Sequence, residues 1–201
     1  MKRNNVNEKE FSAIILAAGK SERMGFPKLS LRYDEKENFI EHIISEYLSF
    51  GCKDIAVVVN EIGFEYLNKY EIQFPDIVKV VINEHPEWHR FYSLKIGAKS
   101  LSETHSVFIH NVDNPFVNND VLKALFNNIN TADYISPEFE GKGGHPFLLS
   151  EKVIKEIAQV EEDRKHLKEF LNQFLKIKVP VEDEKVLVNI NTIEEYRKNF
   201  D

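Results

Sequence analysis

Short, uninterrupted apolar segments are the feature that most constrains the fold of this chain. They occupy residues 13–18, 54–60, 77–83 and 107–113 and are rich in valine, isoleucine and alanine. Segments that are apolar on both faces and this short are typical of strands buried inside a parallel sheet. The sequence therefore predicts a sheet with both of its faces covered.

The segments between these strands carry helix signals. Asn38 and Glu41 form a capping-box pattern, and Gly51 stands where the following helix would end. Between them, the apolar residues that share one helical face are Ile40, Ile43, Ile44, Tyr47 and Leu48. Residues 90–101 and 117–129 also predict helices. This alternation predicts an α/β domain, with a mostly parallel open sheet flanked by helices.

The pattern changes after Tyr134. We expect strands at residues 147–149, 177–181 and 186–190, and a charged helical stretch at residues 152–175. Thr192 and Glu195 form a second capping box before a final helix at residues 193–200. Because no Pro/Gly/Ser-rich linker divides the chain, we expect one domain at residues 11–201 after a polar extension at residues 1–10.

Composition narrows the classes of function. The 201 residues carry a formal net charge of −7, which disfavours a general nucleic-acid binder. Cys52 is the only cysteine, so the chain has no internal disulfide, as is usual in a reducing compartment. The N-terminal residues are polar, unlike a signal peptide, and the apolar runs are too short to span a bilayer. We expect a cytoplasmic protein without a nucleic-acid or membrane partner.

A glycine-containing loop, LAAGKSERMGFPK at residues 16–28, follows the first apolar segment. Small residues there allow a ligand to approach the backbone, and successive amides can form an anion-binding nest. The loop also carries three cationic residues, Lys20, Arg23 and Lys28. These features favour a polyphosphate site, although an ordinary polar connection remains the alternative. The glycine spacing matches neither a P-loop nor a Rossmann fingerprint.

Asp113 ends the fourth apolar segment and is followed by Asn114 and Pro115. Ligands of open α/β sheets bind beyond the carboxyl ends of the strands, so we expect Asp113 near the glycine loop. A single carboxylate at that place suits Mg²⁺, which keeps its other positions for water and phosphate oxygens. A turn-forming aspartate without a metal is the alternative.

The loop sequence LAAGKSERMGFPKLSL, at residues 16–31, resembles the signature of the molybdenum-cofactor-type nucleotidyltransferases. These enzymes belong to the glycosyltransferase-A-like superfamily with the nucleotide-diphospho-sugar transferase fold. The resemblance implies that Arg23 and Lys28 contact the triphosphate and act in catalysis together with Asp113. The nucleotide-binding residues that it implies are Leu16, Ala17, Ala18, Gly19, Ser21, Arg23, Gly25, Lys28, Asn83, Ser93 and Asp113.

Three further segments share this resemblance. VFIHNVDNPFV at residues 107–117 resembles the family's metal-binding segment, with Asp113 at the metal position and Val112 in place of glycine. GKGGHPFLLS at residues 141–150 resembles a segment near the acceptor, although His145 has the alternative of bonding only its own loop. In VLVNINTIEEY, at residues 186–196, Asn189 and Asn191 replace aspartates. The resemblance implies Asp113 and Asn191 as metal ligands, and as acceptor-binding residues Asn114, Pro115, Gly144 and His145.

Together these resemblances imply an Mg²⁺-dependent enzyme that transfers a nucleoside monophosphate from a nucleoside triphosphate to a phosphorylated acceptor such as molybdopterin. Pyrophosphate is the other product. The Leu-Ala-Ala-Gly opening favours CTP over GTP, whereas the Asn-Ile-Asn-Thr segment favours the guanylyl branch. A sugar- or polyol-phosphate cytidylyltransferase and a non-catalytic nucleotide-binding regulatory domain are the alternatives. We expect a monomer or a weak homodimer.

Overall fold

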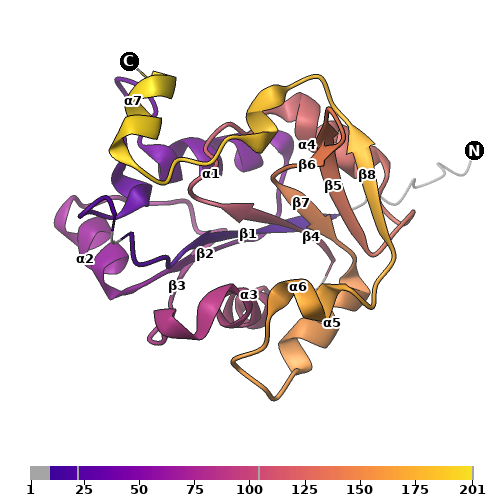
Figure 1. The fold of residues 1–201 in the computed structure, drawn as a ribbon. Helices are drawn as coiled ribbons and strands as arrows, with labels where there is room; N and C mark the ends of the chain where they lie inside the picture. The colour runs from indigo at the N-terminus through magenta and orange to yellow at the C-terminus, as the bar shows by residue number, and fades with distance from the viewer. Residues whose placement is uncertain (1–9, 22, 104, 201) are drawn as a thin grey trace, which may run out of the picture.

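The computed structural model describes residues 10–21, 23–103 and 105–200 as an α/β structure with a central sheet (Figure 1). The strands are β1 (Phe11–Ala17), β2 (Ile55–Val59), β3 (Val78–Ile82), β4 (Ser106–Asn111), β5 (Tyr134–Phe139), β6 (Lys142–Gly143), β7 (Phe147–Leu149) and β8 (Lys176–Pro180). The helices are α1 (Phe39–Phe50), α2 (Glu61–Lys69), α3 (His89–Ser100), α4 (Asn119–Asn127), α5 (Glu151–Gln159), α6 (Leu167–Leu171) and α7 (Ile193–Phe200). Short 3₁₀ helices are η1 (Lys28–Ser30), η2 (Pro86–Trp88) and η3 (Glu184–Leu187).

The strand order explains why three of the four predicted segments are buried on both faces. The expectation was wrong for the segment at residues 77–83, because its strand β3 lies at the edge of the sheet and leaves Val80 and Ile82 exposed. The sheet runs β3-β2-β1-β4-β7-β5-β6, and β8 pairs with β5. Strands β3, β2, β1 and β4 are mutually parallel, whereas β7 is antiparallel to β4. Every residue of β1, β2 and β4 is buried. The prediction of a mostly parallel sheet flanked by helices is therefore confirmed.

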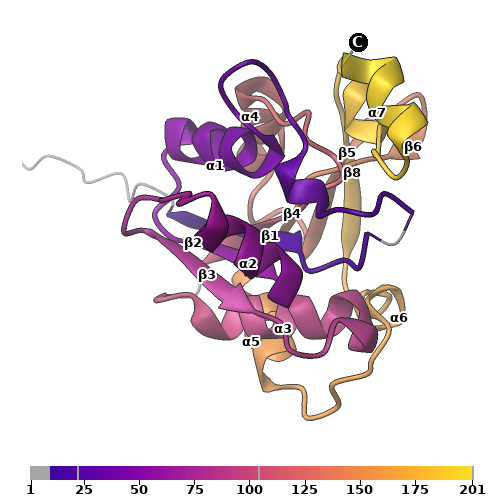
Figure 2. The same ribbon diagram turned by 90° about the vertical axis from the view of Figure 1, so that its left-hand side faces the viewer.

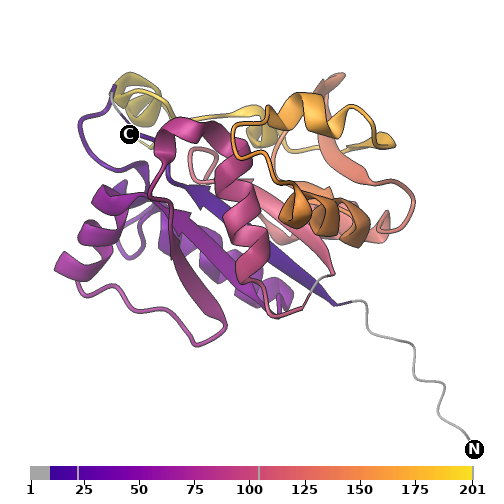
Figure 3. The same cartoon turned by 90° about the horizontal axis from the view of Figure 1, so that it is seen from below.

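Helices cover the sheet on two sides and create two hydrophobic clusters. Helices α1 and α4 lie over one face, and α3, α5 and α6 lie over the other, as Figures 1 and 3 show. Helix α3 approaches β1 so closely that a Cβ added to Gly97 would lie 2.7 Å from Ile14 Cγ2. This close packing fixes the position of α3 against β1. Among the described residues, no helix has the length and apolar character needed to cross a bilayer.

Two predicted elements differ in the structure. The strand predicted at residues 186–190 is the end of η3 followed by unpaired chain. Its backbone hydrogen bonds go to loops instead of a strand: Val186 O accepts from His145 N, and Ile190 N donates to Asp113 O. The helical stretch predicted at residues 152–175 is divided into α5 and α6.

An ion pair ties the loop between α5 and α6 to α3. Lys95, on the buried side of α3, pairs with Asp163 in the intervening loop at 2.6 Å. A buried ammonium requires such a partner, and this pairing holds the loop at Asp163 against α3. Strands β5 and β6 and helix α2 lie in segments where no specific element was predicted.

Candidate active site

A cavity of about 500 Å³ lies at the carboxyl ends of β1 and β4. Figure 2 shows the loop after β1 between α7 above it and α3 below it. Four chain segments that are distant in sequence therefore meet here. The lining residues are Leu16, Ala17, Ala18, Gly19, Lys20, Ser21, Arg23, Lys28, Pro86, His89, Arg90, Ser93, Asn111, Val112, Asp113 and Asn191.

The predicted glycine loop forms the floor of this cavity. Ser21 O accepts hydrogen bonds from the backbone N–H groups of Met24 and Gly25, at 2.9 and 3.2 Å, and closes the turn. Gly25 has a φ of +74°, a left-handed conformation that glycine adopts without strain. Gly25 does not line the cavity, so its place in the structure is to shape the turn.

Asn60 anchors this loop, and sequence reasoning did not single it out. Its side-chain amide donates to Gly19 O at 3.2 Å, and its Oδ1 accepts from Gly63 N at the start of α2. An asparagine just after a buried strand is a common N-cap. That N-cap signal could have identified the residue, but it gives no indication of the second contact with the loop.

The charge of the cavity is opposite in sign to the charge of the chain. Among its described lining residues, Lys20, Arg23, Lys28 and Arg90 are cationic, and Asp113 is acidic. The whole chain, in contrast, has a formal net charge of −7. A local excess of cations beside backbone amides attracts a polyanion regardless of the net charge.

Lys28 links the two predicted metal ligands. Its Nζ donates to Asn191 Oδ1 at 2.7 Å and lies 3.5 Å from Asp113 Oδ2. The Lys28 side chain is only 14% exposed. Burial lowers the pKa of this ammonium, and the Asp113 carboxylate opposes the shift. The end of β4 and the segment before α7 therefore direct two side-chain oxygens at one cation.

The donor set fits a hard divalent cation. Mg²⁺ prefers oxygen ligands, and Asp113 and Asn191 supply a carboxylate and an amide oxygen. Asp113 Oδ1 is buried and has no hydrogen-bond partner among the described residues. A buried carboxylate oxygen without a partner is costly unless a cation satisfies it. Asp113 and Asn191 are therefore suited to hold a metal together.

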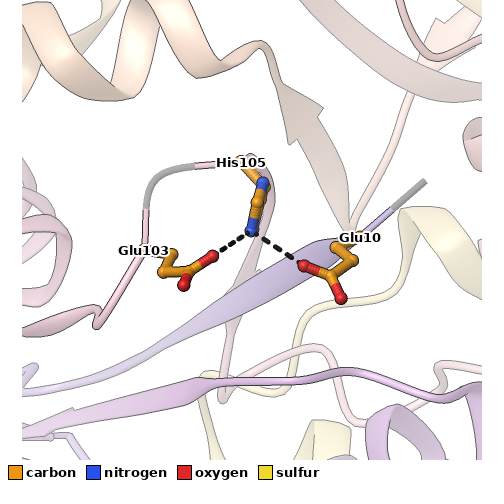
Figure 4. A group of neighbouring side chains, drawn as sticks. All are labelled: Glu10, Glu103 and His105. Atoms are coloured by element: carbon orange, nitrogen blue, oxygen red, sulfur yellow. Dashed lines mark hydrogen bonds and ion pairs between the residues drawn. The ribbon is translucent and has the colours of Figure 1, made fainter. Parts of the chain in front are cut away.

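Another group of potential metal ligands lies at the opposite ends of the same strands. Glu10 precedes β1 and His105 precedes β4, and Figure 4 shows Glu10 and Glu103 directed at His105. His105 Nε2 is 3.3 Å from Glu10 Oε2 and 3.1 Å from Glu103 Oε2. Both glutamates are exposed, and exposed acidic groups of this kind are common without a metal ion. This group is remote from the cavity and does not belong to the candidate active site.

Helix α3 contributes one predicted residue to the cavity and buries another. Ser93 lines the cavity, whereas Asn83 is buried and donates to Ser93 Oγ at 2.8 Å. Asn83 Oδ1 also accepts from His85 N at 2.7 Å. The structure therefore gives Asn83 the role of positioning Ser93, and does not place it on the cavity wall.

Arg90 is a cavity residue that sequence reasoning missed. It lies three residues before Ser93 on α3, so the two share one helix face. Arg90 and its neighbour His89 also line a second cavity of about 390 Å³. His89 has a φ of +66°, an unusual conformation for a residue with a Cβ, and such strain concentrates at functional sites. The helix spacing relative to Ser93 was the signal available in the sequence.

His145 lies on this second cavity, together with Tyr134, Phe147 and Lys176. Burial lowers the pKa of His145 to about 4, and Arg90 adds to the shift. The imidazole is therefore neutral near pH 7, with one ring nitrogen able to accept and the other able to donate. Asn111 Nδ2 lies 3.2 Å from His145 Nε2 and connects this ring to the end of β4.

Three residues predicted to bind the acceptor are buried away from both cavities. Asn114 is fully buried, and its side-chain amide donates to the backbone carbonyls of Lys185 and Val188. Pro115 and Gly144 are also buried, and a Cβ on Gly144 would lie 2.5 Å from Val186 O. Asn114 and Gly144 therefore hold the 185–188 segment, which leads to Asn191.

His110 supports Asn114 from inside the sheet and predicts an acid-sensitive fold. Its Nε2 lies 2.7 Å from Asn114 O and its Nδ1 lies 3.1 Å from Tyr47 Oη. A carbonyl only accepts, so Nε2 carries the proton and Nδ1 accepts from the tyrosine hydroxyl. Burial lowers the pKa of His110 to about 3, whereas an unfolded histidine titrates near its ordinary value of about 6.5.

Between these two pKa values, the unfolded chain binds a proton that the folded protein does not. The free energy of unfolding should therefore fall as the pH decreases from about 6.5 towards 3, by up to about 1.4 kcal/mol per pH unit from this group. Urea unfolding at several pH values measures the slope. In His110→Gln, which keeps a donor and an acceptor, that contribution should be absent. Equal slopes for both proteins would contradict the assignment.

Comparison with known proteins agrees with this geometry. A family described as "MobA-like NTP transferase domain" matches residues 13–178. A protein of Clostridium perfringens strain 13, named "Probable molybdenum cofactor guanylyltransferase", is 28% identical over 92% of this chain and 93% of its own length. Its name does not support the expected preference for CTP.

Solved structures share the fold. Molybdopterin-guanine dinucleotide biosynthesis protein A of Archaeoglobus fulgidus has a TM-score of 0.68 at 17% identity, covering 94% of this chain and 96% of that one. Rv0371C of Mycobacterium tuberculosis, in a structure titled as a complex with manganese, has a TM-score of 0.74 at 18% identity, covering 95% and 98%. Because the family match covers residues 13–178, which is most of the sequence, this chain belongs to the MobA-like NTP transferase family and is a nucleotidyltransferase.

Proposed function

We propose that this enzyme transfers a nucleoside monophosphate from a nucleoside triphosphate to the phosphate of molybdopterin, with Mg²⁺ bound by Asp113 and Asn191. The observation that carries the proposal is the convergence of the cationic glycine loop and the Asp113–Asn191 pair on one cavity. Predicted residues on its wall are Leu16, Ala17, Ala18, Gly19, Ser21, Arg23, Lys28, Ser93, Asp113 and Asn191.

The chemistry makes few demands on the protein. An acceptor phosphate is already ionised near pH 7, so no strong general base is needed. When bound, Mg²⁺ neutralises phosphate charge and orients the reacting oxygens. The protein's own task is electrostatic: Arg23 and Lys28 stabilise the charge that accumulates on the phosphates in the transition state. Backbone groups of the glycine loop contact the nucleotide, and Ser93 is placed to donate to a phosphate.

The two cavities suggest how the substrates are arranged. His89 and Arg90 line both cavities, so a donor in the larger one and an acceptor in the smaller one would meet beside Arg90. The aromatic residues Tyr134 and Phe147 offer apolar surface for a flat ring. His145, neutral near pH 7, is placed to donate a hydrogen bond to the acceptor. This arrangement supports a phosphorylated ring compound as acceptor.

We propose GTP as the donor because the curated relatives are named guanylyltransferases and the Asn-Ile-Asn-Thr segment resembles that branch. A second candidate is cytidylyl transfer to molybdopterin or to a sugar or polyol phosphate. It is favoured by Leu16, Ala17, Ala18 and Gly19, which resemble the cytidylyl branch.

Pyrophosphate release tests both candidates. The protein is incubated with Mg²⁺, with GTP or CTP, and with or without molybdopterin or a sugar phosphate. The proposal expects acceptor-dependent pyrophosphate with GTP and molybdopterin, and a product whose mass exceeds that of the acceptor by one guanylyl group, which is GMP less one water. Release with CTP instead would replace GTP by the second candidate. Tight nucleotide binding without pyrophosphate from any acceptor would refute the proposed reaction.

A further inference from the structure

The metal position proposed above already holds a positive charge that belongs to the protein. The ammonium of Lys28 lies between Asp113 and Asn191, 3.5 Å from the carboxylate and 2.7 Å from the amide oxygen. The 2.7 Å hydrogen bond uses the Asn191 oxygen that would coordinate the metal. Two cations compete for one pair of oxygens, because like charges at this separation repel strongly in a partly buried site.

The backbone segments that carry these two oxygens are tied to each other and to α7, which limits how far the oxygens can separate to accommodate two cations. Asp113 O accepts from Ile190 N at 2.6 Å, which ties the end of β4 to the segment that carries Asn191. Glu195 Oε2 accepts from Asn191 N at 2.6 Å and from Thr192 N at 3.1 Å. Helix α7, which follows, packs on α1 through the rings of Phe200 and Phe39, 5.2 Å apart.

The Lys28 ammonium, in contrast, ends a flexible side chain and can move. The surrounding cavity already contains the site for phosphate groups on the glycine loop. Phosphates there would give the ammonium a stronger electrostatic partner, because a triphosphate carries several negative charges whereas Asp113 carries one and the Asn191 amide carries none. We infer that the Lys28 ammonium takes the place of the metal in the free protein, between Asp113 and Asn191. When nucleotide binds, the ammonium moves to the phosphates and leaves this position to the metal.

The inference rests on the proposed function, because it takes Asp113 and Asn191 as the metal ligands. Its consequence is that metal and triphosphate bind cooperatively, each favouring the arrangement that the other needs. The free protein should bind a divalent cation weakly, because only molecules in which Lys28 has left the position are competent. If that fraction is about a tenth, the apparent affinity for metal is reduced about tenfold.

Mn²⁺ titration without nucleotide, followed by electron paramagnetic resonance of the free ion, tests the inference. Lys28→Met keeps an unbranched side chain that is one atom shorter and removes its charge. We expect this variant to bind one Mn²⁺ about tenfold or more tightly than the unchanged protein. Arg23→Met is the matched control, since it removes a positive charge from the same cavity but not from the Asp113–Asn191 position. Its gain in Mn²⁺ affinity should be much smaller.

Two further measurements show whether the tighter Mn²⁺ binding arises at the Asp113–Asn191 position. Adding Asp113→Asn to Lys28→Met should remove the tighter Mn²⁺ binding. Binding of GTP or CTP in the presence of EDTA should be weaker in Lys28→Met than in the unchanged protein, because the phosphates lose a cation. Opposite effects on metal and nucleotide are not expected from a change in folding, which circular dichroism checks directly. Lys28→Gln repeats the test if methionine disturbs the loop.

If Lys28→Met and Arg23→Met bind Mn²⁺ with equal affinity, the gain comes from the loss of any positive charge in the cavity. That result would overturn the inference. An unchanged or weaker Mn²⁺ affinity in Lys28→Met would overturn it too. The outcome does not depend on catalysis, because no substrate is present in the metal titration. Absence of pyrophosphate release with every acceptor would therefore count against the proposed function alone.

Discussion

Replacing Asp113 by asparagine should lower the rate of pyrophosphate release by a factor of about 10² to 10³ or more, while the protein remains folded. The amide keeps the shape of the side chain and one oxygen, but it removes the only acidic group among the described lining residues of the cavity. A neutral ligand neither balances the charge of a divalent metal nor fixes its position as firmly. Initial rates at saturating nucleotide and Mg²⁺ measure the loss.

The stability of this variant separates a functional from a structural aspartate. Asp113 Oδ1 is buried without a hydrogen-bond partner among the described residues, whereas Oδ2 lies 3.5 Å from the Lys28 ammonium. Asp113→Asn relieves the cost of the first oxygen but removes the counter-ion of Lys28, and these two effects act in opposite directions. We therefore expect the melting temperature of Asp113→Asn to stay within a few degrees of that of the unchanged protein. A large fall in melting temperature together with the loss of activity would identify Asp113 as a structural residue.

Gly144→Ala should destabilise the protein by about 2–4 kcal/mol and also reduce its affinity for metal. A Cβ at Gly144 would lie 2.5 Å from Val186 O and 2.8 Å from Val186 C, both backbone atoms that cannot rotate away. The 185–188 segment must therefore move, and it leads directly to Asn191. Urea unfolding measures the stability, and Mn²⁺ titration measures the effect on the metal position.

The neighbouring glycine provides a matched control for this prediction. A Cβ at Gly143 would have Ser136 Oγ as its nearest neighbour at 3.5 Å, which is an ordinary van der Waals contact. Gly143 is also exposed, whereas Gly144 is buried. Gly143→Ala should therefore change stability by less than about 1 kcal/mol and leave metal affinity unchanged. Similar losses in the two variants would show that loop flexibility matters more than the close approach to Val186.

The parallel half of the fold could be predicted because its signals are local. Strands β1, β2 and β4 are buried on both faces, and that environment leaves uninterrupted apolar runs in the sequence. The caps of α1 were equally visible: Asn38 and Glu41 form the expected capping box, and Gly51 ends the helix in the left-handed conformation. The place of the loop between α5 and α6 was not predictable, because the ion pair that holds it against α3 joins Lys95 to a residue far along the chain.

The candidate site also contains some residues that the sequence could predict and others that it could not. Residues on the glycine loop and at the end of β4 reach the cavity because the strands carry them there, as the rule for open α/β sheets predicts. Asn83 and Asn114 carry polar side chains at equally plausible places, yet each is buried and holds another segment. A single sequence cannot distinguish a polar residue that binds a ligand from one that satisfies a buried backbone. Arg90 was missed because its role depends on how α3 begins.

The hydrogen bond between Lys28 and Asn191 joins positions 163 residues apart. Contacts of such long range form only after the intervening chain has been organised, because loop closure must precede them. The parallel strands can assemble from the N-terminal half, but the pair of oxygens at Asp113 and Asn191 has to await the later segment. A chain that ends before Asn191 therefore carries the cationic glycine loop but lacks one of the two side-chain oxygens that contact Lys28.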